Sequence, residues 1–240
     1  MSKKCCDFAP ENIKTMETQI KSLETFVKCH QDKMAEFLTN SKLVLNGIVI
    51  QPTEIEVYYY HAGEFEDKSV HQNNLQQNNA RHFYIHRYGV KETDSIKGGN
   101  RAGIDFVLSE EANKYYTYLI RSALINDQLI VGPHKVLVAI QEASHLDFTE
   151  IEKTTVQIVE NKIPGVVLFS ERINLGKNAG EFRNLKLRAV LCDDSFIEHK
   201  YLAKERMITD YILNRNMSKE QAIEFARQKL GYIPKIVSQQ

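Results

Sequence analysis

The chain has few cysteines, no net charge and no long apolar run, and each shortage excludes a class of protein. Its four cysteines, Cys5, Cys6, Cys29 and Cys192, form no CxxC pair, so we expect no zinc site, and no other metal or cofactor is indicated. The adjacent Cys5 and Cys6 argue against a disulfide framework and favour a reducing, intracellular compartment. No apolar run approaches the roughly 20 residues that cross a bilayer, and the polar residues 1–4 are not followed by the apolar core of a signal peptide. We therefore expect no membrane segment.

The chain has no formal net charge, because it contains 31 Lys and Arg residues and 31 Asp and Glu residues. The sequence pI of about 7.1 indicates no general affinity for a polyanion, so a nucleic-acid surface would require local segregation of charge. A length of 240 residues allows one large or two small domains. One dominant domain with terminal extensions is the simplest interpretation.

Two apolar patterns open the chain. Between residues 13 and 38 apolar side chains recur mostly at steps of three and four, which predicts an amphipathic helix that starts near Pro10, with a possible interruption near His30. Residues 43–50 are apolar on both faces and predict a buried strand. Residues 51–53 then predict a turn into the next strand.

The segment 54–60 alternates acidic and aromatic residues with other apolar ones. Alternate side chains of a strand point to opposite faces, so Glu54, Glu56, Tyr58 and Tyr60 are expected on one side. Carboxylates and phenols on one face indicate a site. A solvated edge strand, or glutamates paired with lysines across a sheet, would explain the same pattern.

A polar loop and a hairpin follow. Residues 73–79 are Asn- and Gln-rich, show no periodicity and give little reason to expect packing. Residues 82–88 and 104–108 alternate and, with turn formers between them, predict a β-hairpin with a long tip. That tip carries three cations, Lys91, Lys97 and Arg101, which are expected to be solvated or to contact phosphate.

The strand predicted at residues 115–125 carries Arg121 among apolar neighbours. A buried guanidinium needs an anionic partner, so we expect Glu54, Glu56 or a ligand beside it.

The remaining chain alternates predicted helices and strands. Residues 132–135 predict a helix start, and residues 147–161 a further helix. Residues 166–169 and 185–191 predict strands. Ser218 and Gln221 form a capping-box pattern at the start of a C-terminal helix.

These motifs together resemble the alkyladenine (methylpurine, 3-methyladenine) DNA glycosylase family, of which the chain would be a divergent member. Residues 54–58 are similar to a Glu-x-Glu-Ala-Tyr strand of that family, and Asp67 and His71 keep its Asp-to-His spacing. Four later segments follow in the family's order: 83–86, 119–121, 132–135 and the Arg, Gly and Ala-Gly-Glu block of 172–188. The resemblance covers about residues 35–195.

The resemblance implies an α+β fold with a single mixed domain. It predicts a curved antiparallel β-sheet core, a protruding β-hairpin and surrounding helices over residues 35–199, with helical extensions at 1–34 and 200–240. The implied activity is that of a monofunctional DNA glycosylase, which flips a damaged purine out of double-stranded DNA and hydrolyses its N-glycosidic bond without a cofactor. Extrusion costs a few kcal/mol and is easiest for damaged or mispaired bases.

The resemblance also assigns roles to residues. Glu56 matches the general base that activates water against an oxocarbenium-like sugar, and we expect it to face a small aromatic chamber. Arg121 matches an arginine near that water and the phosphate, where its charge would help to keep Glu56 ionised. Tyr58 and His71 match residues that enclose the flipped base. The backbone at Ile173 matches the segment that helps to position the water.

The chain departs from the family at several positions. His86 stands where the family has a stacking tyrosine, and Asp105 where it has an asparagine that helps to exclude guanine. An ionised aspartate is only an acceptor, so we expect altered base selectivity that extends to guanine-type lesions. Tyr88 on the hairpin is the candidate for insertion into the DNA stack. The family's Arg- and Gly-rich loop is replaced by residues 73–79.

Other interpretations stay open. Glu56 and Arg121 could form a purely structural ion pair. The chain could be a catalytically inactive nucleic-acid-binding or damage-recognition module with the same fold, because fold does not determine function. It could instead be an interaction protein whose terminal helices mediate assembly.

Overall fold

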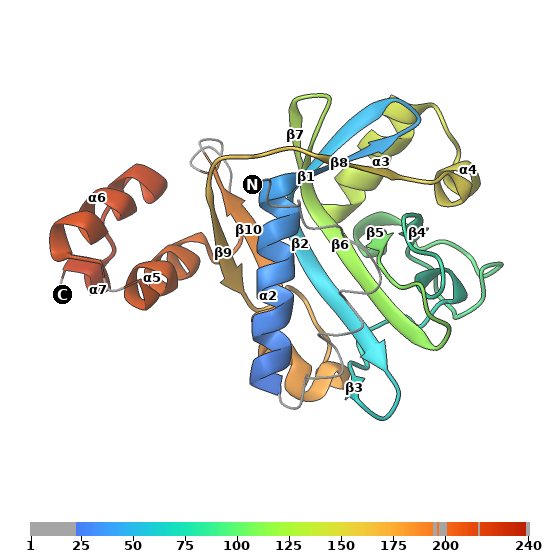
Figure 1. Cartoon of the computed structure of the whole chain (residues 1–240), viewed down its shortest axis with the longest axis horizontal. Helices are drawn as coiled ribbons and strands as arrows, with labels where there is room; N and C mark the ends of the chain where they lie inside the picture. Colours follow the sequence, from blue (N-terminus) through green and yellow to red (C-terminus); the bar gives the residue numbers. More distant parts are fainter. Residues whose placement is uncertain (1–22, 194–195, 197–200, 216, 239–240) are drawn as a thin grey trace, which may run out of the picture.

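A computed structural model describes residues 23–193, 196, 201–215 and 217–238. The described strands form one curled antiparallel sheet with helices around it (Figure 1), so the predicted α+β fold is confirmed. The strands are β1 (Ser41–Leu45), β2 (Ile48–His61), β3 (Phe65–Glu66), β4 (Phe83–Ile85), β5 (Ile104–Val107), β6 (Lys114–Ile125), β7 (Gln128–Val131), β8 (Gln157–Glu160), β9 (Val166–Ser170) and β10 (Arg188–Cys192). The helices are α2 (Leu23–Asn40), α3 (Pro133–Ser144), α4 (Phe148–Lys153), α5 (Lys204–Asn214), α6 (Lys219–Leu230) and α7 (Lys235–Ser238), with 3-10 segments η1 (Asn74–Gln76), η2 (Gly99–Arg101) and η3 (Lys177–Asn184).

Strand β2 organises the sheet because both of its edges are paired. One edge pairs with β6 over most of its length, and the other pairs in turn with β1, β10 and β3. A β-bulge lies at Pro52 and Glu54, where the neighbour changes from β1 to β10. Proline has no N–H for the ladder, so this break is a position where a strand tolerates it. The predicted turn at 51–53 is therefore wrong, since these residues lie inside β2.

The strand predicted at residues 43–50 is also wrong, because it is a hairpin. Asn46 and Gly47 have φ of +46° and +81° and connect β1 to β2. Two residues with positive φ, of the Asn-Gly type, form the turn whose twist matches that of paired antiparallel strands.

Helix α2 runs without a break through His30, so the predicted interruption is wrong. The predicted start near Pro10 lies outside the described residues. The expected boundary between residues 34 and 35 falls inside this helix, which buries Phe26, Met34 and Phe37 in the main core. Residues 23–34 thus belong to the domain and are not a separate extension.

The core has two parts. Ile55, Val57 and Tyr59 point from β2 into the larger cluster, between the sheet and helices α2 and α3, and so the predicted alternation of faces is confirmed. A smaller cluster joins α5, α6 and α7 to Leu168 and Val190 of β9 and β10. In Figure 1 these three helices lie beyond β9 and β10, at the end of the molecule away from β4 and β5.

The hairpin of β4 and β5 is present, with Phe83 opposite Phe106. A buried ion pair attaches it to α4, because Arg87 Nη2 lies 2.6 Å from Glu152 Oε2. The helix predicted at 147–161 is shorter than expected, because Gln157–Glu160 pair with β1 as β8.

Helices α3 and α6 start as predicted, the latter at the capping box of Ser218. None of the helices in the described ranges is long and apolar enough to span a bilayer. Cys29 and Cys192 are buried and are not joined in a disulfide.

Candidate functional site

The polar face of β2 carries a network of buried charges around Glu54. Arg188 donates from Nε to Glu54 Oε1 at 2.7 Å, and Arg121 donates to the same oxygen at 3.2 Å. Ser122 donates to Oε2 at 2.8 Å. Arg121 Nη1 also lies 3.4 Å from Glu56 Oε1, so both glutamates are the anionic partners that the sequence required.

Glu56 is completely buried, with no exposed surface. The backbone N–H of Ile173 donates to its Oε1 at 2.8 Å, and the hydroxyl of Tyr58 donates to its Oε2 at 3.1 Å. Burial raises the pKa of Glu56 above its ordinary value, although Arg121 and the Ile173 N–H act in the opposite direction. Arg121 therefore favours the ionised form as expected, but burial outweighs it.

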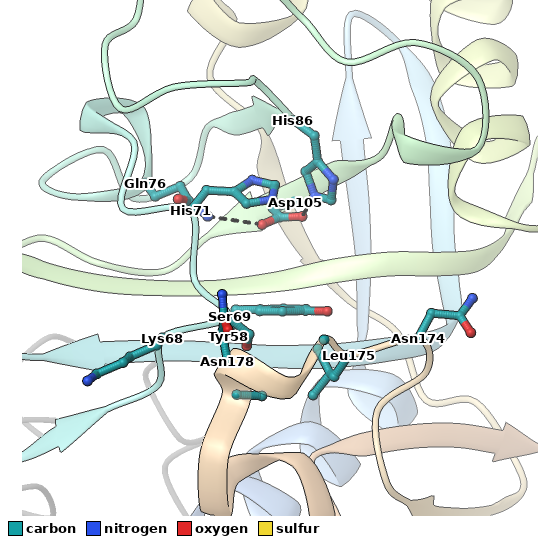
Figure 2. Close-up of a pocket in the computed structure, with 12 residues that line it drawn as sticks. Tyr58, Lys68, Ser69, His71, Gln76, His86, Asp105, Asn174, Leu175 and Asn178 are labelled. Atoms are coloured by element: carbon teal, nitrogen blue, oxygen red, sulfur yellow. Dashed lines mark hydrogen bonds and ion pairs between the residues drawn. The ribbon is translucent and has the colours of Figure 1, made fainter.

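A cavity of about 310 Å³ lies next to Tyr58, which lines it. The four residues predicted to enclose a base, Tyr58, His71, His86 and Asp105, all line it. Figure 2 shows Tyr58 on one side of this space and the two histidines with Asp105 on the other. The volume lies at the lower end of the range of roughly 300–1,000 Å³ for small-molecule sites. The roles of these residues stay predictions.

Glu56 and Arg121 are not among the described residues that line the cavity. The expectation that Glu56 faces a small aromatic chamber is therefore wrong in this structure, since the carboxylate is fully buried and does not line the space. Tyr58 connects the cavity to Glu56, because its ring lines the cavity and its hydroxyl donates to the Glu56 carboxylate. Ile173 precedes Asn174 and Leu175, which line the same cavity.

Tyr58 is held by a buried arginine. The guanidinium carbon of Arg172 lies 4.7 Å from the centre of the Tyr58 ring, and Arg172 Nη1 lies 2.6 Å from Asp67 Oδ2. The guanidinium also donates to the carbonyl of Val57 at 3.0 Å. Burial, followed by the charge of Glu56, raises the pKa of Tyr58 well above its ordinary value. Its hydroxyl thus stays protonated and can donate to Glu56.

Asp105 and His86 form a pair opposite Tyr58. His86 Nε2 lies 2.7 Å from Asp105 Oδ1, while Thr117 and Gln76 donate to Oδ2 at 2.8 and 3.3 Å. Burial raises the pKa of Asp105, but the neighbouring His86 and the hydrogen bonds from His86 and Thr117 outweigh it and leave the pKa below its ordinary value. Three donors occupy a carboxylate with about four acceptor positions. Asp105 is thus an acceptor with most of its positions occupied, and the expected change in base selectivity stays a prediction.

His71 is neutral and both of its ring nitrogens are engaged. Burial, with the charges of His86 and Lys97, lowers its pKa from 6.5 to about 3. Nε2 lies 2.8 Å from Lys97 Nζ, and Nδ1 lies 3.0 Å from the Tyr84 hydroxyl. A lysine ammonium can only donate, so Nε2 accepts and the ring proton is assigned to Nδ1, which donates to Tyr84.

Sequence reasoning missed several residues of the site. The sequence predicts a polar loop with little reason to pack at Gln76, yet this side chain is buried together with Asn73. Asn73 and Gln76 form a capping box at η1, and this spacing was a signal that could have found them. Lys97 contacts His71 at 2.8 Å and is therefore not simply solvated, while the expected phosphate contact stays a prediction.

Tyr88, the candidate for insertion, is 59% exposed on the hairpin. It is therefore accessible to a partner, and its role stays a prediction. In the described part of the chain no group of three His, Cys, Asp or Glu side chains is arranged to hold a metal ion.

The chain matches no family model, and no curated protein matches it significantly. The functional argument therefore depends on the motifs and on the geometry of the cavity.

Proposed function

We propose that this chain is a monofunctional DNA glycosylase, which binds a damaged purine flipped out of double-stranded DNA and hydrolyses its N-glycosidic bond. The observation that supports the proposal is the convergence of Tyr58, His71, His86 and Asp105 on one cavity, with the Glu56 carboxylate one hydrogen bond behind Tyr58. An intracellular setting, where such DNA is found, is part of the proposal.

The cavity suits a flat base. An aromatic ring on one side and two imidazoles on the other can sandwich a purine, and base–aromatic stacking contributes roughly 1–3 kcal/mol per base. That gain is comparable with the few kcal/mol that extrusion costs. Bases that already pair poorly are therefore favoured, and Tyr88 would fill the vacated stack.

Glu56 would act as the general base of the reaction. Burial raises its pKa, which makes the carboxylate a stronger base for a water proton once it is ionised. Arg121 and the Ile173 N–H hold its Oε1, so Oε2 is the oxygen that can meet the water. The Tyr58 hydroxyl occupies that oxygen now. The proposed reaction therefore requires this hydroxyl to release Oε2 when a base stacks on the ring.

The burial of Glu56 favours a second candidate, a damage-recognition module without turnover. In that function Glu56 is structural, because a carboxylate with three partners stabilises β2 and Tyr58 and need not meet water. Such a protein would bind a flipped base in the same cavity but would leave the glycosidic bond intact.

Base release from duplexes that each carry one modified purine, read out by alkaline cleavage, separates the candidates. We expect release by the wild type and a loss of about 10²- to 10⁴-fold in Glu56→Gln, with unchanged affinity for a duplex that carries an abasic analogue. Glu171→Gln is the matched control, since Glu171 pairs with Arg206 at the surface. Binding without release by the wild type would support the recognition module, and no binding would favour an interaction protein.

A further inference from the structure

The C-terminal helices α5, α6 and α7 carry an apolar surface that the proposed function does not use. Single apolar residues are normal on a protein surface, but a group of them at one place marks an interaction site. Eight large apolar side chains are exposed in the described ranges, and half of them lie within residues 201–238: Leu202, Leu213, Tyr232 and Ile236.

Three of these four side chains lie at one groove. Leu213 of α5 and Ile236 of α7 line this open groove, which has a volume of about 670 Å³. The Tyr232 hydroxyl donates at 2.6 Å to Glu205, which also lines the groove. The groove therefore presents apolar side chains from two helices to a partner.

The charged groups of the groove are of both signs. Among the described residues two cations and two anions line it. Arg206 lies 2.8 Å from Glu171, and Asp210 lies 2.6 Å from Lys186. A nucleic acid or an anionic membrane is attracted by charge of one sign, so the groove suits neither. It suits a protein surface that is apolar and carries both signs of charge.

The order of the charges along α5 makes this face complementary to a second copy of itself. Arg206 and Asp210 are one helical turn apart and both line the groove. If two α5 helices pack antiparallel about a two-fold axis at the level of Ile208, position 206 of one copy meets position 210 of the other. Arg206 of each copy then lies beside Asp210 of the other. By the same symmetry, Leu213 of each copy lies beside Ala203 of the other.

We propose that the α5 groove is the interface of a symmetric homodimer, in which two copies of the chain pack α5 against α5 in antiparallel orientation. A closed two-fold dimer is the commonest assembly of identical chains. Burial of the apolar side chains supplies the affinity, and the two pairs of opposite charges fix the orientation. The interface lies at the end of the molecule away from β4 and β5 (Figure 1), so both cavities stay open. The dimer does not depend on the proposed glycosylase function.

Sedimentation velocity of the full chain over a range of concentrations tests the dimer. We expect a species of twice the chain mass of 27.7 kDa, whose fraction rises with concentration. Ile236→Glu places a charge in the groove of both copies, so we expect the dissociation constant to rise by about 10²-fold or more. Val159→Glu is the matched control, since Val159 is 45% exposed on β8, outside these helices. A wild type that stays monomeric at every concentration, or equal effects of the two substitutions, would overturn the inference.

Two charge reversals, Arg206→Asp and Asp210→Arg, test the antiparallel orientation. In either variant alone, two copies bring like charges together at both contacts, so we expect monomers. An equal mixture of the two variants brings opposite charges together at both contacts, so we expect a heterodimer. Loss of the ion pair to Glu171 or to Lys186 is the same alone and in the mixture, so it does not affect the comparison. A mixture that stays monomeric, or single variants that dimerise as tightly as the wild type, would contradict the proposed interface.

Discussion

A buried histidine in α2 should make the stability of this protein depend on pH. His30 has no exposed surface, and its Nδ1 donates to the carbonyl of Phe26 at 2.9 Å. Burial lowers the pKa of His30 from 6.5 to about 3, and the charge of Lys33 acts in the same direction. A histidine with a depressed pKa contributes stability above its unfolded pKa and loses it as the pH falls.

The size of this effect follows from the pKa values of His30 in the unfolded chain and in the folded protein. Between pH 7 and pH 4.5 the histidine of the unfolded chain becomes protonated, while His30 in the folded protein stays neutral. Linkage then lowers the free energy of unfolding by about 2.5 kcal/mol over this interval. His30→Phe removes this contribution. The neutral His71 contributes a pH dependence of its own, but it is present in both proteins and cancels in the comparison.

Urea unfolding of the wild type and of His30→Phe at several pH values between 7 and 4.5 measures the difference. The absolute stability of the variant also reflects how phenylalanine fits beside Phe26, so the test is the change of the difference with pH. Between pH 7 and pH 4.5 we expect the free energy of unfolding to fall by about 2.5 kcal/mol less in the variant than in the wild type. Parallel curves for the two proteins would refute the assignment of a neutral, buried His30.

Three further predictions concern the surroundings of the cavity and the hairpin. Arg172→Met leaves buried Asp67 without its ion-pair partner, and we expect a loss of roughly 3–5 kcal/mol in the free energy of unfolding, measured by urea titration. Gly103→Ala places a methyl group 2.8 Å from His86 Cε1, so we expect about 1–3 kcal/mol of destabilisation and weaker binding of a lesion duplex, measured by thermal melting and fluorescence anisotropy. Tyr88→Ala alters a side chain that is 59% exposed, so duplex affinity should fall while the melting temperature stays the same; an unchanged affinity would exclude insertion.

The sequence predicted the main strands because alternation with a period of two depends only on local backbone geometry. Glu54, Glu56 and Tyr58 do share one face of β2, where their partners are found. The same reasoning failed at Pro52, because a proline was interpreted as a turn although a bulge can hold it in a strand. It also failed at Asn46, where the Asn-Gly turn signal lay inside an apolar run.

The sequence could predict which residues belong to the candidate site but not how deeply they are buried. The order of motifs along the chain identified residues that prove to share a cavity. The burial of Glu56, however, results from contacts with Ile173, which lies 117 positions away, and with Tyr58. Likewise Asp105 changes from a free acceptor to an engaged one through Thr117 and Gln76. Such contacts depend on the tertiary fold and leave no local pattern.

The central claim is that a flipped purine enters the cavity between Tyr58 and His86 and frees the Glu56 carboxylate. A crystal structure of Glu56→Gln bound to a lesion-bearing duplex tests it most directly, because this variant should bind without cleaving. We predict that the modified purine lies against the Tyr58 ring and that the Tyr58 hydroxyl no longer contacts residue 56. A complex in which the purine remains stacked in the DNA and the cavity holds no base would contradict the account.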